Sequence, residues 1–151
     1  MDIRSSVRLC AGWIALGAAA GCGAPASLPV AVTVSGDAIP LALSQAPADP
    51  VRGLKIMAGR DANCLLCHAV PESGQRFMGD LAPSLSGIGK RLTAAQLRLR
   101  VVDMSRLNAE TIMPPYYRTT GLYNVAEAYR DKPVLSATEI EDVVAYLQTL
   151  K

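Results

Sequence analysis

Five consecutive residues, Cys64-Leu65-Leu66-Cys67-His68, constrain this chain more than any other feature. A C-x-x-C-H run is the attachment signature of a c-type haem. The two-residue spacer places both sulfurs on the same side of a short helical turn, where each thiol can add across one haem vinyl group. The adjacent imidazole then lies under the iron as the proximal ligand. The run predicts one covalent haem c, bound by Cys64, Cys67 and His68.

The Cys pair has two other known uses. A redox dithiol usually opens the helix after a strand in a βαβ unit, and the sequence shows no such unit. A structural zinc site normally needs four Cys or His ligands. His68 is the only histidine, and no cysteine follows Cys67. Haem attachment is therefore favoured over both.

The length of 151 residues suits one small domain with flanking segments. The chain has one Phe and one Trp, so a covalent haem would supply a large apolar body that the core otherwise lacks. The formal net charge of +2 gives no reason to expect nucleic-acid binding.

Residues 1–22 are predicted to be an export signal. Arg4 and Arg8 precede an apolar run at 9–21, which is shorter than the roughly 20 residues that span a bilayer. The small residues before Cys22 fit either an ordinary leader-peptidase site or a lipobox that would acylate Cys22. The protein is expected in the periplasm, and at a membrane only if Cys22 is lipidated.

Residues 23–48 are rich in Pro, Ala and Ser, with Gly36-Asp37 and Pro40 as turn signals. We expect a short irregular extension there, either a tether behind the export signal or an arm that packs on a partner subunit. The packed haem domain is expected over residues 49–151.

The first helix of that domain is predicted to begin at Asp49, a suitable N-cap, with Pro50 at the first helical position. Val51, Leu54 and Met57 form an apolar stripe that is expected to face the core.

The last helix has the clearest signals. Ser136 and Glu139 form a capping box, and the apolar residues that follow at helical spacing are Ile140, Val143, Val144 and Leu147. The first and last helices of a class I cytochrome c cross closely, and Gly53 facing Tyr146 would suit such a crossing. The expected fold is all-α, a small class I cytochrome c-like helical domain wrapped around one covalent haem.

Residues 81–89 resemble the P-x-L-x-G stretch that is common after C-x-x-C-H. In that stretch the Pro carbonyl accepts the Nδ1–H of the proximal His, which fixes its tautomer and makes it a better ligand. We assign this role to Pro83 and expect Leu85 against the porphyrin. The alternative is an ordinary loop with a turn proline.

Another capped helix is predicted to start at Thr93, with Gln96 completing the cap. The residues expected to face inward are Leu97, Val101 and Met104. Arg98 and Arg100 lie off that stripe and are expected to be solvated.

The sixth iron ligand must be a methionine, because the chain has no second His. Met113 follows His68 by 45 residues, in a Met-Pro-Pro-Tyr-Tyr run, and Pro114 restricts it to extended geometry. Met78 follows by only 10 residues and is the less favoured alternative. We expect His68 and Met113 as the axial pair. Thioether ligation raises the reduction potential, and a filled sixth position favours electron transfer over catalysis at iron.

Several stretches together resemble SoxX, the monohaem cytochrome subunit of the SoxAX complex of bacterial thiosulfate oxidation. They are residues 63–68, 96–103, 112–117, 133–135 and 139–147. Residues 34–50 also resemble the N-terminal part of that family, so the resemblance covers roughly residues 34–151.

The resemblance implies a SoxA-type partner subunit that has its own haem and performs the sulfur chemistry of an L-cysteine S-thiosulfotransferase. The complex couples thiosulfate oxidatively to a cysteine of the carrier protein SoxYZ. This chain would accept the released electrons and pass them to a downstream small cytochrome c, with no catalytic residue of its own. Two alternatives are a stand-alone or lipid-anchored electron carrier for another oxidoreductase, and a haem sensor.

Overall fold

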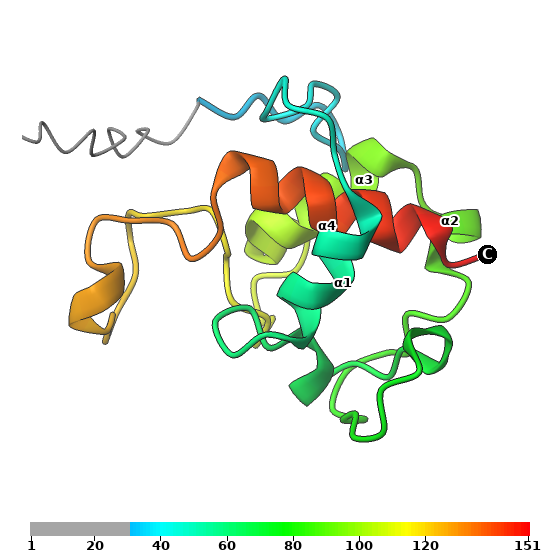
Figure 1. Ribbon diagram of the computed structural model, residues 1–151. Helices are drawn as coiled ribbons and strands as arrows, with labels where there is room; N and C mark the ends of the chain where they lie inside the picture. The colour runs from blue at the N-terminus through cyan, green and yellow to red at the C-terminus, as the bar shows by residue number, and fades with distance from the viewer. Residues whose placement is uncertain (1–30) are drawn as a thin grey trace, which may run out of the picture.

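The computed structural model describes residues 31–151, whose regular elements are all helices (Figure 1). The α-helices are α1 (Pro50–Ala58), α2 (Ile88–Arg91), α3 (Ala94–Asp103) and α4 (Ala137–Thr149), and the short 3-10 helices are η1 (Cys64–Leu66), η2 (Pro71–Ser73), η3 (Met104–Arg106) and η4 (Glu127–Tyr129). This confirms the predicted all-α fold. The predicted export signal, with Cys22, and the start of the extension lie outside the described residues.

Helix α1 begins as its sequence predicts. The Asp49 carboxylate accepts hydrogen bonds from the backbone N–H groups of Val51 and Arg52, at 2.8 and 3.3 Å. Met57 is buried, as expected, but Val51 is 77% exposed, so the predicted stripe was wrong at its first residue. The helix packs through Gly53 and Met57, one turn apart, and Val51 lies on the opposite side of the helix.

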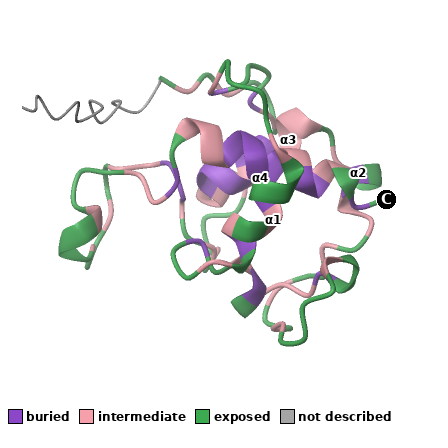
Figure 2. Cartoon of the chain, viewed as in Figure 1, coloured by how far each residue is buried: buried purple, intermediate pink, exposed green. Residues whose placement is uncertain are grey.

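Helices α1 and α4 cross at the centre of the molecule (Figure 1). Gly53 makes the crossing possible, because a Cβ atom there would collide with the Asp142 carbonyl and come within 2.9 Å of the Tyr146 Cβ. The predicted contact between Gly53 and Tyr146 is therefore confirmed. The Ser136–Glu139 capping box is present as well, and the predicted apolar residues of α4 are all buried, as Figure 2 shows along that helix.

Helix α3 has the predicted Thr93–Gln96 capping box and packs on α4. The expectation that Arg98 is solvated was wrong, because its residue surface is only 6% exposed. Its guanidinium donates to both carboxylate oxygens of Glu141 on α4, at 2.7 and 2.8 Å. The paired carboxylate offsets the cost of burying the cation.

Part of the predicted extension belongs to the packed structure. Ile39 and Leu43 are buried in the same apolar core as α3 and α4, and the segment lies along the top of these helices in Figure 1. The Ile39 carbonyl accepts a hydrogen bond from Arg98, and the Leu43 N–H donates to Glu141. The buried ion pair thus fastens this segment to the helices, so the segment packs on its own chain and is more than a tether.

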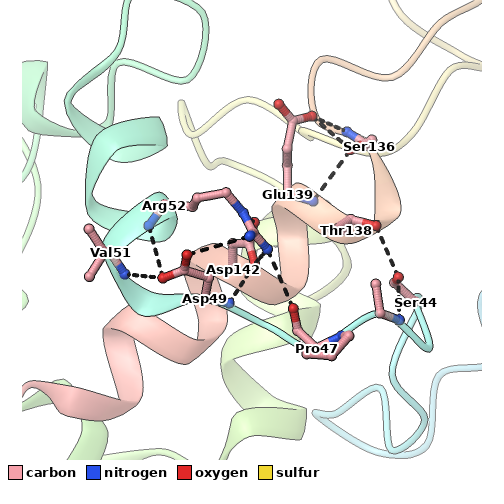
Figure 3. A network of polar contacts seen from close by, with 10 residues as sticks. Ser44, Pro47, Asp49, Val51, Arg52, Ser136, Thr138, Glu139 and Asp142 are labelled. Atoms are coloured by element: carbon pink, nitrogen blue, oxygen red, sulfur yellow. Dashed lines mark hydrogen bonds and ion pairs between the residues drawn. The ribbon is translucent and has the colours of Figure 1, made fainter.

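A second polar network joins the start of α1 to α4 (Figure 3). The Asp142 carboxylate, 1% exposed, accepts from the Asp49 N–H at 2.7 Å and from the Arg52 guanidinium at 2.7 and 2.8 Å. Burial alone would raise the pKa of Asp142, but the hydrogen bonds from Arg52 and Asp49 outweigh it and lower that pKa. The folded state therefore favours the ionised carboxylate.

This network predicts a specific acid sensitivity. Because the pKa of Asp142 is lowered on folding, its contribution to stability is complete above its unfolded pKa of about 3.9 and is lost as the pH falls through the folded pKa. We expect Asp142→Asn to unfold more easily than the wild type at pH 7, and the difference to shrink below about pH 4. Urea unfolding from pH 7 to pH 2.5 measures it. A difference that is constant over this range would contradict the prediction.

The chain between Tyr117 and Leu135 leaves the helical body and returns to it, forming the projecting loop at the left of Figure 1. Two contacts tie this loop back: Arg118 pairs with the buried Asp103 at 3.3 Å, and the Tyr129 hydroxyl donates to Asp61 at 2.8 Å. Among residues 31–151, no helix is both long enough and apolar enough to span a bilayer.

Candidate haem-attachment site

The C-x-x-C-H run forms a tight helical turn. Asn63 enters it in the left-handed conformation (φ 45°), and η1 follows. The N–H groups of Cys67 and His68 both donate to the Cys64 carbonyl, at 3.2 and 3.0 Å. This is the turn that the spacing predicts, and the two half-buried cysteines are not joined by a disulfide.

The imidazole of His68 is held by the segment that contains Pro83. The His68 Nδ1 lies 2.7 Å from the Pro83 carbonyl oxygen. Since a carbonyl can only accept, Nδ1 carries the proton, and in the neutral imidazole Nε2 then keeps its lone pair. The predicted contact is therefore present, and it leaves the second ring nitrogen available to a metal.

A cavity of about 640 Å³ opens beside this turn. Its volume falls within the roughly 300–1,000 Å³ of small-molecule and cofactor sites. The six residues predicted for the site all line it: Cys64, Cys67, His68, Pro83, Leu85 and Met113. Apolar side chains from the helices form much of the remaining wall: Met57, Leu97, Val101, Val143 and Leu147.

The methionines differ in how they lie relative to this cavity. Met113 lines it, on the irregular segment that follows η3. Met78, the alternative ligand, is absent from the lining, and its Sδ accepts a hydrogen bond from the Val70 N–H at 3.1 Å. Met57 and Met104 also line the cavity, but from α1 and η3, as part of the helical framework. The arrangement favours Met113 over Met78.

The protonation of Cys64 argues against a redox dithiol. Burial raises the pKa of its thiol to about 11, and a hydrogen bond with Tyr116 offsets this only in part. Reactive cysteines of C-x-x-C redox sites have lowered pKa values, so the Cys64 environment is of the opposite kind.

Within residues 31–151, no three His, Cys, Asp or Glu side chains gather as a metal-binding group.

Three lining residues were not assigned to the site from the sequence, and one of them, Arg100, was expected to be solvated. Arg91, Arg100 and Tyr116 all line the cavity. The Arg100 side chain is 26% exposed and lies 3.6 Å from the Asp37 carboxylate, and Tyr116 is buried. The Tyr116 hydroxyl donates to the Ala62 carbonyl at 2.7 Å, and burial raises its pKa. The Met-Pro-Pro-Tyr-Tyr run was the available signal for Tyr116, but the run does not say which tyrosine faces the site.

The residues present fit haem c. The cavity is mostly apolar, two thiols lie on its wall at the C-x-x-C spacing, one imidazole has its Nε2 free, and a thioether is available from another segment. These are the groups that a covalently attached, six-coordinate haem requires.

Comparison with known proteins agrees with this fold and site. The family model for cytochrome c matches residues 51–151, and the chain belongs to the cytochrome c family. A crystal structure of SoxXA from P. pantotrophus superposes with a TM-score of 0.75 at 35% sequence identity, covering 83% of this chain and 98% of that chain. Within the family, this chain is a SoxX-type class I cytochrome c. A search of curated proteins found no match.

Proposed function

We propose that this chain is the electron-transfer haem subunit of a SoxAX-type complex. The observation that carries the proposal is the single cavity that collects the six predicted site residues, in a fold shared with a chain of SoxXA at 35% identity. We assign Cys64 and Cys67 to covalent attachment of one haem c, and His68 and Met113 to the two axial positions.

Bound haem c supplies a one-electron redox couple. The protein's side chains would bind the iron and surround the haem. The Pro83 carbonyl holds His68 in one tautomer and increases its basicity through the Nδ1–H bond. Met113 supplies a neutral thioether, which raises the reduction potential relative to a second imidazole. Leu85 and the apolar helical residues line the cavity and would shield bound haem from water.

His68 and Met113 would hold the haem iron from both sides, so we place substrate chemistry elsewhere. We place it in a SoxA-type partner within a heterodimer, where thiosulfate is coupled to a cysteine of the carrier SoxYZ and two electrons are released. This chain accepts them one at a time and passes them to a small cytochrome c. It contributes no catalytic residue.

The experiment that tests the proposal uses the haem-loaded protein. It should co-purify with a co-expressed SoxA-type subunit, and its haem should become reduced when thiosulfate and SoxYZ are added to the complex. If the protein elutes without a partner and thiosulfate does not reduce its haem, a stand-alone carrier is favoured. Carbon monoxide binding to the native ferrous protein, at the iron position that we assign to Met113, would favour a sensor.

We further propose that the protein is periplasmic, because haem c attachment takes place outside the cytoplasm and the N-terminal sequence has the pattern of an export signal. Intact mass of the mature protein tests the N-terminus: an acylated Cys22 would place it at a membrane, and an unmodified cleaved terminus would leave it free.

Replacing Met113 by Ala should abolish the far-red charge-transfer band that reports a thioether on ferric haem iron. Met57 and Met104 are held in helices, and the Met78 sulfur lies outside the cavity lining, so none of them is placed to take over. The reduction potential should fall as well. Met78→Ala is the matched control and should leave the band intact, since its sulfur accepts from Val70 away from the cavity. A band that survives in Met113→Ala and disappears in Met78→Ala would reverse the assignment.

A further inference from the structure

The segment that carries Met113 is poorly fastened near the methionine itself. The Met113 N–H is bound only by the neighbouring Thr111 hydroxyl, at 3.1 Å. The next two residues are Pro114 and Pro115, which have no N–H group to donate. The Met113 side chain packs against the core, but the backbone on its C-terminal side can be held only by residues after the two prolines.

Tyr116 is the first residue after Met113 whose backbone is tied to the helical body. Its N–H donates to the Val101 carbonyl on α3 at 3.4 Å, and its carbonyl accepts from the Leu135 N–H, just before α4, at 3.0 Å. Tyr116 also lines the cavity and is 5% exposed.

The side chain of Tyr116 reaches the opposite part of the site. Its hydroxyl donates to the Ala62 carbonyl at 2.7 Å, a buried contact between residues 54 positions apart. Ala62 lies two residues before Cys64, and the Cys64 sulfur also interacts with the same hydroxyl. One buried hydroxyl thus joins the loop that bears the thioether to the loop that bears the attachment cysteines.

We propose that Tyr116 is a positioning residue for Met113, whose hydroxyl holds the thioether-bearing loop closed against the attachment loop. The inference rests on the proposed His68 and Met113 ligation. A thioether is a weak, neutral ligand, so its occupancy of the iron depends on how firmly the protein presents it. Displacement of Met113 by another ligand requires this loop to move outward, and the hydroxyl contact opposes that motion.

The test is titration of the ferric haem-loaded protein with imidazole, followed by the loss of the far-red thioether band. Tyr116→Phe keeps the ring and removes only the hydroxyl. Loss of one buried hydrogen bond should tighten apparent imidazole binding about five- to tenfold. Haem content per chain should equal that of the wild type.

Tyr146→Phe is the matched control. Tyr146 is also a buried tyrosine, but its hydroxyl has no hydrogen-bond partner within residues 31–151. Its imidazole affinity should match the wild type. Equal affinities in Tyr116→Phe and the wild type would overturn the inference, as would equal gains in both variants or a Tyr116→Phe protein that fails to acquire haem. If the wild type itself lacks the far-red band, the Met113 ligation of the proposed function fails instead.

Discussion

Replacing Cys64 and Cys67 together by Ser should leave the protein with no covalently bound haem. A serine hydroxyl is too weak a nucleophile to add to a vinyl group. Serine is nearly the same size as cysteine, so the turn at η1 can still form. Each single variant should retain one thioether bond. The measurement is haem staining after denaturing electrophoresis, together with the intact mass of each variant.

Cys22→Ser is the control for the loss of a thiol as such. Cys22 lies outside the described residues and outside the attachment run, so this variant should stain for haem like the wild type. A double variant that still stains would place the attachment elsewhere. The effect should extend to stability, because a cavity of about 640 Å³ lined by apolar side chains would lose the body that we propose fills it.

The parts of the fold that could be predicted from the sequence are those specified by neighbouring residues. Asp49 caps α1 through the next two N–H groups, and Ser136 with Glu139 caps α4. The C-x-x-C-H turn is equally local, since its hydrogen bonds end on the Cys64 carbonyl. Gly53 was predictable for a different reason, because a close helix crossing excludes any Cβ there.

What could not be predicted depends on partners far apart in the chain. Arg98 is indistinguishable from a solvated arginine until Glu141 is placed against it, 43 positions away. Ile39 and Leu43 lie in a segment of weak pattern, and only their contacts with that pair and the core fix them. In the site, Tyr116 is positioned by the hydrogen bond from its hydroxyl to the Ala62 carbonyl. The spacing of neighbouring residues cannot predict a contact between residues 54 positions apart.

The Arg98–Glu141 pair should be among the most sensitive points of the fold. Both side chains are less than 10% exposed, and the same two groups also bind the Ile39 carbonyl and the Leu43 N–H. Glu141→Gln preserves the shape and one acceptor oxygen, but it replaces the other acceptor by an NH2 donor and leaves a buried guanidinium without its counter-charge. We expect the free energy of unfolding to fall by about 3 kcal/mol.

The chain offers a matched comparison in the Arg130–Glu127 pair of the projecting loop. That pair joins the same residue types at 2.8 Å, but its side chains are 63% and 82% exposed. Water replaces the lost partner there, so Glu127→Gln should cost less than about 1 kcal/mol. Denaturant unfolding of the two haem-loaded variants, followed by far-UV circular dichroism, gives both values. If the two substitutions cost the same, the buried pair does not hold residues 39–43 to the helices. If only Glu141→Gln is costly, proteolysis before α1 should also become faster, because the fastening of this segment depends on the buried charge.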